Sequence, residues 1–469
     1  MENFSTKQIL FALLVCALGL PLRAGQSQGL DREFKSAVAQ YDSGHYIEAA
    51  AKLEDLVQKV PESFEVHELL GLVYSAQSKD ASANPHLEKA VRLNPNSAPA
   101  RTNLAANLVR LGKLDRAGAQ FKKALELDPK SYDTNHNLAE FYVQSRKVAE
   151  AVPYLERAQQ LESSSYDNGY DLSLAYLLTG RLADARRQIK ELLNVKNTAE
   201  LHNLLGAVEE KDGKFVQAAN EYELAAHADP SESNLFDWGS ELLMHRTLGP
   251  AIEVFQDAVK RYPESPRLAI GLGVAFDAHG NYDEAVKSLL RAADLNPSDP
   301  SCYLFLSRAY YSSPSQADEV VQRFRRFSEL QPRNAQALYY YAMSLWKGKR
   351  AEDPSLDLHQ IEVLLKKALE LDPKLADAHL QLGNLYSDQR KYAEAIPEYL
   401  LALKLNPDLA DAHYRLGQAY VRTGQRDAAQ AQLQVYQKMN EKHLADIEKQ
   451  RAEVRQFVYA AKDSPSAKP

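Results

Sequence analysis

Four histidines are the first residues in this sequence that could carry chemistry: His67, His202, His379 and His413. Histidine is the side chain that most readily serves as a general acid, a general base or a metal ligand near neutral pH. The four are separated by about 34 residues or by rough multiples of that spacing, which is typical of stacked helical units. Residues spread in this way cannot converge on one ion, so we expect them to be packing residues.

Other catalytic and metal-binding motifs are missing from the sequence. It contains no HExxH, paired CxxC, GxGxxG or P-loop pattern, and HELLG at His67–Gly71 lacks the second histidine. The two cysteines are Cys16 and Cys302, and no serine elbow motif or paired carboxylates stand out. The sequence therefore predicts no enzyme, no catalytic or metal site and no cofactor.

Length and composition limit the classes of protein that remain. With 469 residues the chain is too long for one compact core, so several domains or a repeat array are expected. Charged residues make up 25% and hydrophobic residues 45%, as in folded soluble proteins. The formal net charge of −7 lacks the basic excess of a nucleic-acid-binding protein. We expect no nucleic-acid partner.

The N-terminus has the pattern of a secretory signal. MENFSTK contains Lys7, an apolar run extends from Ile9 to Leu22, and LRA precedes a predicted cleavage site after Ala24. The run is shorter than the roughly 20 residues that span a bilayer. We expect residues 1–24 to be removed and the protein to be exported, periplasmic or secreted. The alternative is an uncleaved anchor, which would be the chain's one association with a membrane.

A repeat organises the rest of the chain. The nonamer KKALELDPK occurs at Lys122–Lys130 and again at Lys366–Lys374. It reads as the end of an amphipathic helix stopped by a proline. Prolines after similar helix-like runs recur at a spacing near 34 residues, or at multiples of it: Pro61, Pro95, Pro129, Pro230, Pro263, Pro297, Pro332, Pro373 and Pro407. Such a fixed period predicts an array of small helical units.

Each unit repeats the same residue types at the same slots. In the unit from Phe64 to Ser97, slots four, seven, eight and eleven are His67, Leu70, Gly71 and Tyr74, one face of a first helix. Small residues at slots eight, twenty and twenty-seven would let helix axes approach to about 8–10 Å.

This pattern resembles the tetratricopeptide-repeat family over residues 30–443, about twelve units. The resemblance implies an all-α fold, a right-handed superhelical solenoid of 34-residue helix–turn–helix repeats. Departures are local: the unit at Tyr166–Thr198 ends without proline, and Trp346–Gln360 lengthens one turn.

The last helix is expected to continue beyond its repeat. Residues 426–462 contain neither glycine nor proline and keep a helical spacing, so we predict a long helix that caps the array. A dimerising coiled coil is the alternative, and the oligomeric state stays open. Residues 463–469 are predicted to be disordered.

The family resemblance implies that slots five, nine, twelve and thirteen line a concave groove. In several units these slots are apolar, whereas His136 and Glu140, or Asn384 and Ser387, occupy them elsewhere. An apolar face of this kind either binds a partner or is covered by the chain itself. The candidate groove residues are Tyr170, Leu174, Leu177, Leu178, Phe236, Leu243, Met244, Ile270, Val274, Tyr339, Met343 and Trp346.

The sequence therefore predicts a non-enzymatic scaffold of the cell envelope or periplasm that holds an extended peptide or partner helix in its groove. An accessory scaffold of envelope assembly or polysaccharide export is the alternative within that class. A glycosyltransferase fused to such repeats is disfavoured, because too few residues follow residue 443 for a catalytic domain.

Overall fold

The computed structural model describes residues 24–313, 315–347 and 357–442, and every helix or strand assigned within those ranges is an α-helix. The all-α prediction is confirmed. The predicted signal segment up to residue 23, the continuation of the last helix over residues 443–462 and the predicted tail at residues 463–469 lie outside the described residues.

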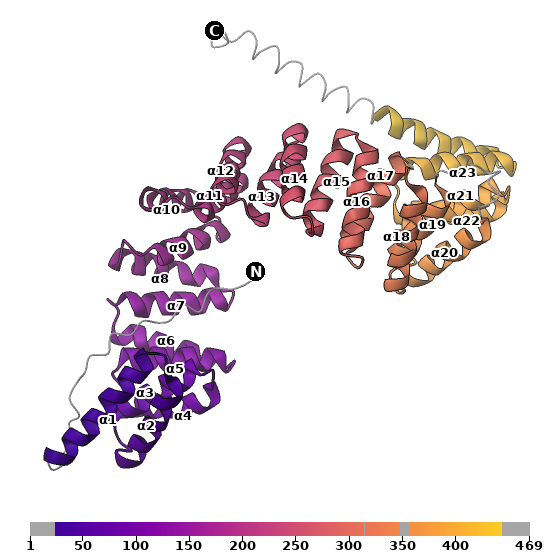
Figure 1. Cartoon of the computed structure of the whole chain (residues 1–469). Coiled ribbons are helices and arrows are strands. Elements are labelled where there is room, and N and C mark those ends of the chain that lie inside the picture. The colour runs from indigo at the N-terminus through magenta and orange to yellow at the C-terminus, as the bar shows by residue number, and fades with distance from the viewer. Residues whose placement is uncertain (1–23, 314, 348–356, 443–469) are drawn as a thin grey trace, which may run out of the picture. The chain divides into compact units, whose positions relative to one another are not determined.

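The first of two compact units ends at Ala228, and its helices pair along the chain (Figure 1). Each pair is one repeat, with a first helix followed by an antiparallel second helix. The helices of this unit are α1 (Ala24–Asp42), α2 (Tyr46–Lys59), α3 (Phe64–Ala76), α4 (Asp80–Leu93), α5 (Ala98–Arg110), α6 (Leu114–Leu127), α7 (Tyr132–Gln144), α8 (Val148–Leu161), α9 (Tyr166–Leu178), α10 (Leu182–Val195), α11 (Ala199–Lys211) and α12 (Phe215–Ala228).

The second unit begins at Asp229 and has the same construction. Its helices are α13 (Glu232–Met244), α14 (Leu248–Arg261), α15 (Pro266–His279), α16 (Tyr282–Leu295), α17 (Pro300–Ser312), α18 (Ala317–Leu330), α19 (Ala335–Trp346), α20 (Leu358–Leu371), α21 (Ala376–Asp388), α22 (Tyr392–Leu405) and α23 (Ala410–Arg422). Residues 426–442 are helical as well and pair with α23 as the start of the predicted capping helix.

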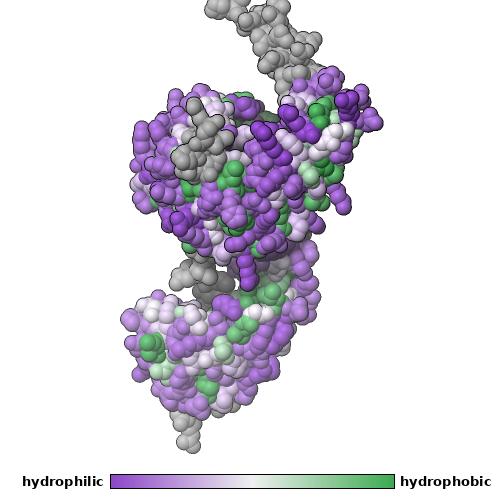
Figure 2. All heavy atoms as spheres, turned by 90° about the vertical axis from the view of Figure 1, so that its right-hand side faces the viewer, coloured by the Kyte–Doolittle hydropathy of each residue, from purple (hydrophilic) through white to green (hydrophobic). Residues whose placement is uncertain are grey.

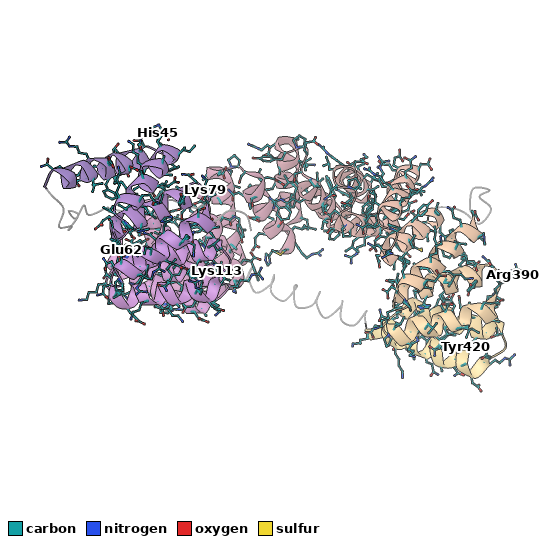
Figure 3. All side chains as sticks on the ribbon, turned by 90° about the horizontal axis from the view of Figure 1, so that it is seen from below. His45, Glu62, Lys79, Lys113, Arg390 and Tyr420 are labelled. Atoms are coloured by element: carbon teal, nitrogen blue, oxygen red, sulfur yellow. The ribbon has the colours of Figure 1, made fainter. Side chains whose placement is uncertain are left out.

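First and second helices begin in different ways. Most first helices start after a hydroxyl or amide side chain that accepts a backbone N–H, as Ser131 Oγ does from Thr134. Most second helices start after residues such as His45, Lys79 and Lys113, which provide no side-chain cap (Figure 3). The backbone closes the turn there instead: the Lys113 N–H donates to the Leu108 carbonyl (2.8 Å), and Gly112 between them has φ +70°.

Small residues bring the two helices of a repeat together. A Cβ on Gly383 would lie 2.7 Å from the ring of Tyr399 on the facing helix, and one on Gly71 would lie 2.6 Å from Leu87. Ala395 is fully buried beside this contact. The prediction that small side chains permit close approach is therefore confirmed at these positions.

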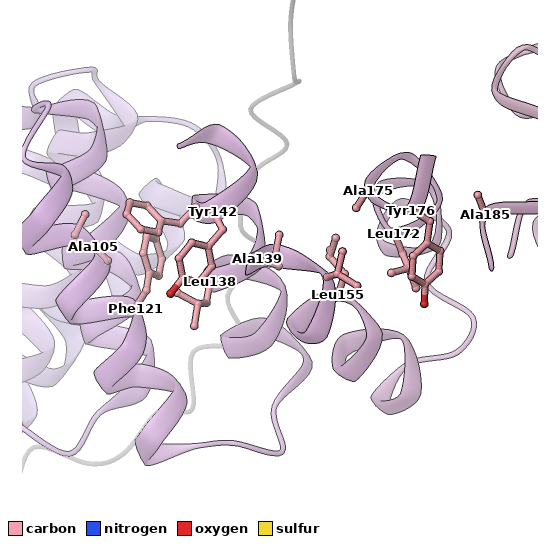
Figure 4. Packing of buried hydrophobic residues seen from close by; sticks show 14 of the residues in the cluster. Ala105, Phe121, Leu138, Ala139, Tyr142, Leu155, Leu172, Ala175, Tyr176 and Ala185 are labelled. Carbon is pink, nitrogen blue, oxygen red and sulfur yellow. The ribbon is translucent and has the colours of Figure 1, made fainter. Parts of the chain in front are cut away.

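The core is a row of clusters between successive helices. Figure 4 shows one in the first unit, where Phe121, Leu138 and Tyr142 lie buried together. Burial of each such side chain stabilises the fold by roughly 1.5–3 kcal/mol. Within the described residues, helices pack mainly against the next one or two helices along the chain.

Candidate partner-binding face

The four repeated histidines anchor the turns between repeats. His379 Nε2 donates to the Pro373 carbonyl at the turn before its helix (3.2 Å), and Nδ1 lies 2.6 Å from Glu398 on the second helix. Each ring joins a turn and the two helices of its repeat.

Other side chains make the same bond in other repeats. We call the side chain that bonds this turn carbonyl from slot four the turn anchor. Arg101 donates to the Pro95 carbonyl (2.9 Å), Asn135 to that of Pro129 and Tyr303 to that of Pro297. Four chemically different donors serve one geometry, so the histidines are structural, as the sequence predicted.

Repeats whose slot four is glycine, alanine or leucine lack a turn anchor, and the repeat of α15 is one of them. Slot four of α15 is Ala269, and the opposing residue on α16 is Ser288. A hollow of about 200 Å³ lies there, bounded also by Val259 and Leu272. Arg291 bonds the turn carbonyl of Pro263 instead, at 2.7 Å.

The one cysteine among the described residues is inert. Cys302 is fully buried, and its Sγ–H donates to the Asp299 carbonyl (3.1 Å). Burial raises the pKa of this thiol to about 12, so the thiolate that nucleophilic chemistry needs is scarcely formed near neutral pH. Across residues 24–313, 315–347 and 357–442, no group of three or more His, Cys, Asp or Glu is arranged to hold a metal ion.

The predicted groove residues of the first unit lie together on α9. Tyr170, Leu174 and Leu177 are half-buried and pack against the core cluster. Leu178 is 57% exposed. The apolar strip of α9 therefore has an inner part that supports the fold and an exposed end.

Carboxyl groups surround this strip. Asp171 is half-buried, and desolvation with the nearby charges of Glu140 and Asp167 raises its pKa to about 6. His136 on α7 lowers that pKa in part, and its Nδ1 lies 3.1 Å from Asn168 Oδ1. The face across α7 and α9 thus combines apolar side chains with carboxyl groups.

The predicted groove residues of the second unit are spread over three first helices. Met244 on α13 is 57% exposed, whereas Leu243 beside it is half-buried. Phe236 is half-buried, and the guanidinium of Arg267 lies over its ring, 4.7 Å from the centroid. The remaining predicted residues are half-buried: Ile270 and Val274 on α15, and Tyr339, Met343 and Trp346 on α19.

The face residues of α17, the first helix between α15 and α19 in the chain, were not among the predicted groove residues. On α17, Leu304, Arg308 and Tyr311 occupy slots five, nine and twelve. Tyr311 is 66% exposed, and the Lys347 ammonium lies 3.8 Å from its ring centroid. The slot rule that selected the other residues would have found these three.

The slot rule is wrong at α21. Asn384 on α21 was expected to be a polar groove residue, but it is buried and accepts a hydrogen bond from Tyr399 of its own repeat (2.9 Å). Ser387 contacts the same hydroxyl at 3.0 Å. These two polar side chains are part of the packing of that repeat.

The rest of the visible surface is mixed. On the face drawn in Figure 2, hydrophilic side chains predominate and hydrophobic ones show between them. A search of the described helices finds none with the length and apolar character to cross a membrane.

Comparisons with known proteins agree with this architecture. Tetratricopeptide-repeat models match residues 34–98, 102–168 and 236–300, and related models match 143–208, 364–396, 383–424 and 410–443. No curated protein matches the chain.

Among solved structures, the complex of Naa15/Naa10 bound to HypK-THB is 19% identical, with 86% of this chain and 68% of that chain covered and a TM-score of 0.39. YrrB, a TPR protein with an unusual peptide-binding site, is 20% identical over 39% of this chain and 95% of its own, with a TM-score of 0.33. PilF of Pseudomonas aeruginosa is 17% identical over 45% and 96%, with a TM-score of 0.39.

Proteins built from these repeats generally mediate protein–protein interactions and are typically non-enzymatic. The family models cover most of both compact units, and the helix pairs, turns and packing slots agree with them. The chain belongs to the tetratricopeptide-repeat family.

Proposed function

We propose that this protein is a non-enzymatic scaffold that holds an extended peptide or a partner helix on the exposed faces of its first helices. The observation that carries the proposal is the exposure of large apolar side chains on that face. Leu178 and Met244 are each 57% exposed, and Tyr311 is 66% exposed. Apolar side chains of this size gain most when a partner removes them from water.

The test replaces exposed face residues that the fold does not need. Leu178→Asp and Tyr311→Asp place a charge on the face of each unit, and both side chains are mostly exposed. Leu174 is a poorer choice, because it packs against the core and its loss would destabilise the fold. Val195→Asp is the matched control, since Val195 is 83% exposed at the end of a second helix.

Partners captured from the producing cells are compared by mass spectrometry, and thermal melting is measured in parallel. The proposal expects the two face variants to lose partners at an unchanged melting temperature, while the control keeps them. An identical partner set for all three variants would reject the face as the binding surface.

The proposal places the scaffold in the cell envelope or periplasm, supported by the signal-like pattern of MENFSTK and the apolar run Ile9–Leu22. Service in envelope assembly or polysaccharide export is a narrower version of the same role. The mass of the intact protein from the producing cells tests the location. A mature chain that begins near Gly25 supports export. A soluble protein whose mass still includes the N-terminal segment with Lys7 contradicts it.

A further inference from the structure

The face of α9 is apolar at its exposed C-terminal end, and its N-terminal half carries acidic groups near Tyr170. Leu178 is 57% exposed, and Leu174 and Leu177 continue the strip toward the core. An isolated apolar strip says little about what covers it. The charged groups near the strip indicate which kind of partner could cover it.

Carboxyl groups reach this strip from three neighbouring first helices. Glu140 lies on α7, Asp167 and Asp171 lie on α9, and Glu200 on α11 is close enough to act on Tyr170. Glu140 accepts a hydrogen bond from Gln144, a neutral donor. In the described part of the chain, neither Glu140 nor Asp171 has an ion-pair partner within 4.0 Å. An uncompensated charge that is partly removed from water attracts a cation strongly.

Two lysines and one histidine near this face contact groups other than Glu140 and Asp171. Lys211 Nζ donates to the Leu177 carbonyl at the end of α9 (2.9 Å). Lys196 Nζ lies 5.1 Å from the ring centroid of Tyr166. His136 is bonded to Asn168. Since neither lysine forms an ion pair with Asp171 or Glu140, positive charge from a partner can compensate these two carboxylates.

We propose that the face formed by α7, α9 and α11 binds a cationic amphipathic segment of another protein. Its apolar residues pack on Leu174 and Leu178, and its lysine or arginine side chains reach Asp171 and Glu140. This inference rests on the proposed function and specifies the chemistry of the partner. The face of the second unit differs, because Arg308 and Lys347 lie among its apolar residues.

The probes are synthetic peptides tested for binding to the full chain by fluorescence anisotropy. The first is a 14-residue peptide with leucine at helical spacing and lysine elsewhere. The second carries glutamate in place of lysine, and the third is the lysine peptide in scrambled order. We expect the first peptide to bind at least about tenfold more tightly than either of the others.

Paired variants locate the binding. Asp171→Asn with Glu140→Gln removes two charges at nearly constant size and should weaken the lysine peptide about tenfold, with a smaller dependence on salt. Glu126→Gln with Glu370→Gln removes two exposed carboxylates elsewhere and should leave binding unchanged. Leu178→Ala should weaken binding without changing the melting temperature.

Acidity supplies an independent readout. Lowering the pH through about 6 protonates Asp171 in a field set by His136, Glu140 and Asp167, and so removes the charge that the peptide needs. The lysine peptide should bind more weakly at pH 5 than at pH 7.5. Asp171→Asn should show a smaller change over the same range.

Several results would overturn the inference. Equal binding of the ordered and scrambled lysine peptides would show that the attraction is non-specific and electrostatic. Tighter binding of the glutamate peptide would show that the face prefers an anionic partner. A peptide copying residues 449–462 of this chain, KQRAEVRQFVYAAK, is also cationic and apolar. Tighter binding of that peptide than of the lysine peptide would assign the face to the protein's own segment.

The two levels of the proposal fail separately. If Leu178→Asp loses cellular partners but Asp171→Asn with Glu140→Gln keeps them, the face binds a partner and its cationic chemistry is wrong. If none of these variants loses partners, the proposed function fails together with the inference.

Discussion

Replacing the buried carboxyl group of Glu68 by an amide should stabilise the protein at alkaline pH and have little effect at acidic pH. Glu68 is on α3 and is only 8% exposed. Its Oε1 accepts a hydrogen bond of 3.2 Å from Asn103 Nδ2. Desolvation, with a smaller contribution from Glu65, raises its pKa to about 7 against the opposing effect of that hydrogen bond.

The direction in which stability changes with pH follows from the raised pKa of Glu68. A carboxyl group whose pKa is higher in the folded state than in the unfolded chain binds its proton more tightly when folded. The stability that this proton contributes is fully present below the unfolded value of 4.5 and is lost as the pH rises through about 7. The difference corresponds to at most about 3 kcal/mol, at about 1.4 kcal/mol per pKa unit. Glu68→Gln keeps the size of the side chain and removes the ionisation.

The assay is urea unfolding followed by circular dichroism at pH 5 and pH 8. We expect Glu68→Gln to exceed the wild type by as much as about 3 kcal/mol at pH 8 and to match it closely at pH 5. Glu370→Gln, at an exposed position on α20, serves as the control and should show no such pH-dependent gain. An equal difference from the wild type at both pH values would refute the reasoning, because it would show that ionisation of Glu68 is not what destabilises the fold.

Three further predictions concern the packing of the repeats and the expectation that neither disulfides nor metal ions stabilise the fold. Ala269→His with Ser288→Glu should fill the 200 Å³ hollow with a turn anchor and raise the melting temperature, and a lower value would show that the hollow is too small. Gly383→Ala should destabilise the fold by roughly 1–3 kcal/mol in urea titrations, because its Cβ would lie 2.7 Å from the ring of Tyr399; an unchanged midpoint would contradict the close approach. Chelator and reductant should leave the melting curve unchanged, since Cys302 is buried and unpaired; a drop of several degrees with either would reveal a site that the described residues do not show.

The repeat architecture was predictable because each repeat solves the same packing problem with the same residue types. Gly383 and Tyr399 meet across one helix pair, and Gly71 and Leu87 meet across another. A fixed period in the sequence therefore translates directly into a fixed geometry. The unusual turns were less predictable: Arg390 takes φ +60° at a position where Gly112 serves in another repeat, so glycine spacing alone does not locate them.

The direction of a side chain was easier to predict than its depth. Leu174 and Leu178 both occupy groove slots, yet one packs against the core and the other is 57% exposed. Asn384 occupies a groove slot and is buried under Tyr399. Helical periodicity gives the angle of a residue around its helix, whereas burial depends on how far the neighbouring helix covers it.

Only one of the two bonds that each turn-anchor histidine makes could be predicted from the sequence. The residue 19 positions after His379 is Glu398, and the same separation joins His67 with His86 and His413 with Gln432. The other partner of each of these rings is a backbone carbonyl, which has no identity in the sequence. The side-chain partner of each anchor could therefore be found from the 19-residue spacing, whereas the carbonyl partner could be found only from the fold.

The anchors also bear on where function can reside in this chain. The carbonyl of the turn proline is one that the helices do not satisfy, and a buried carbonyl without a donor is costly. Several repeats meet that need from slot four with different donors, as His379, Arg101, Asn135 and Tyr303 do. The core slots are constrained in the same way by packing. The exposed side chains of the first helices are less constrained by both requirements. Their differences between repeats, carboxyl groups on α9 and an aromatic side chain with a cation at Tyr311, are where a partner can be selected.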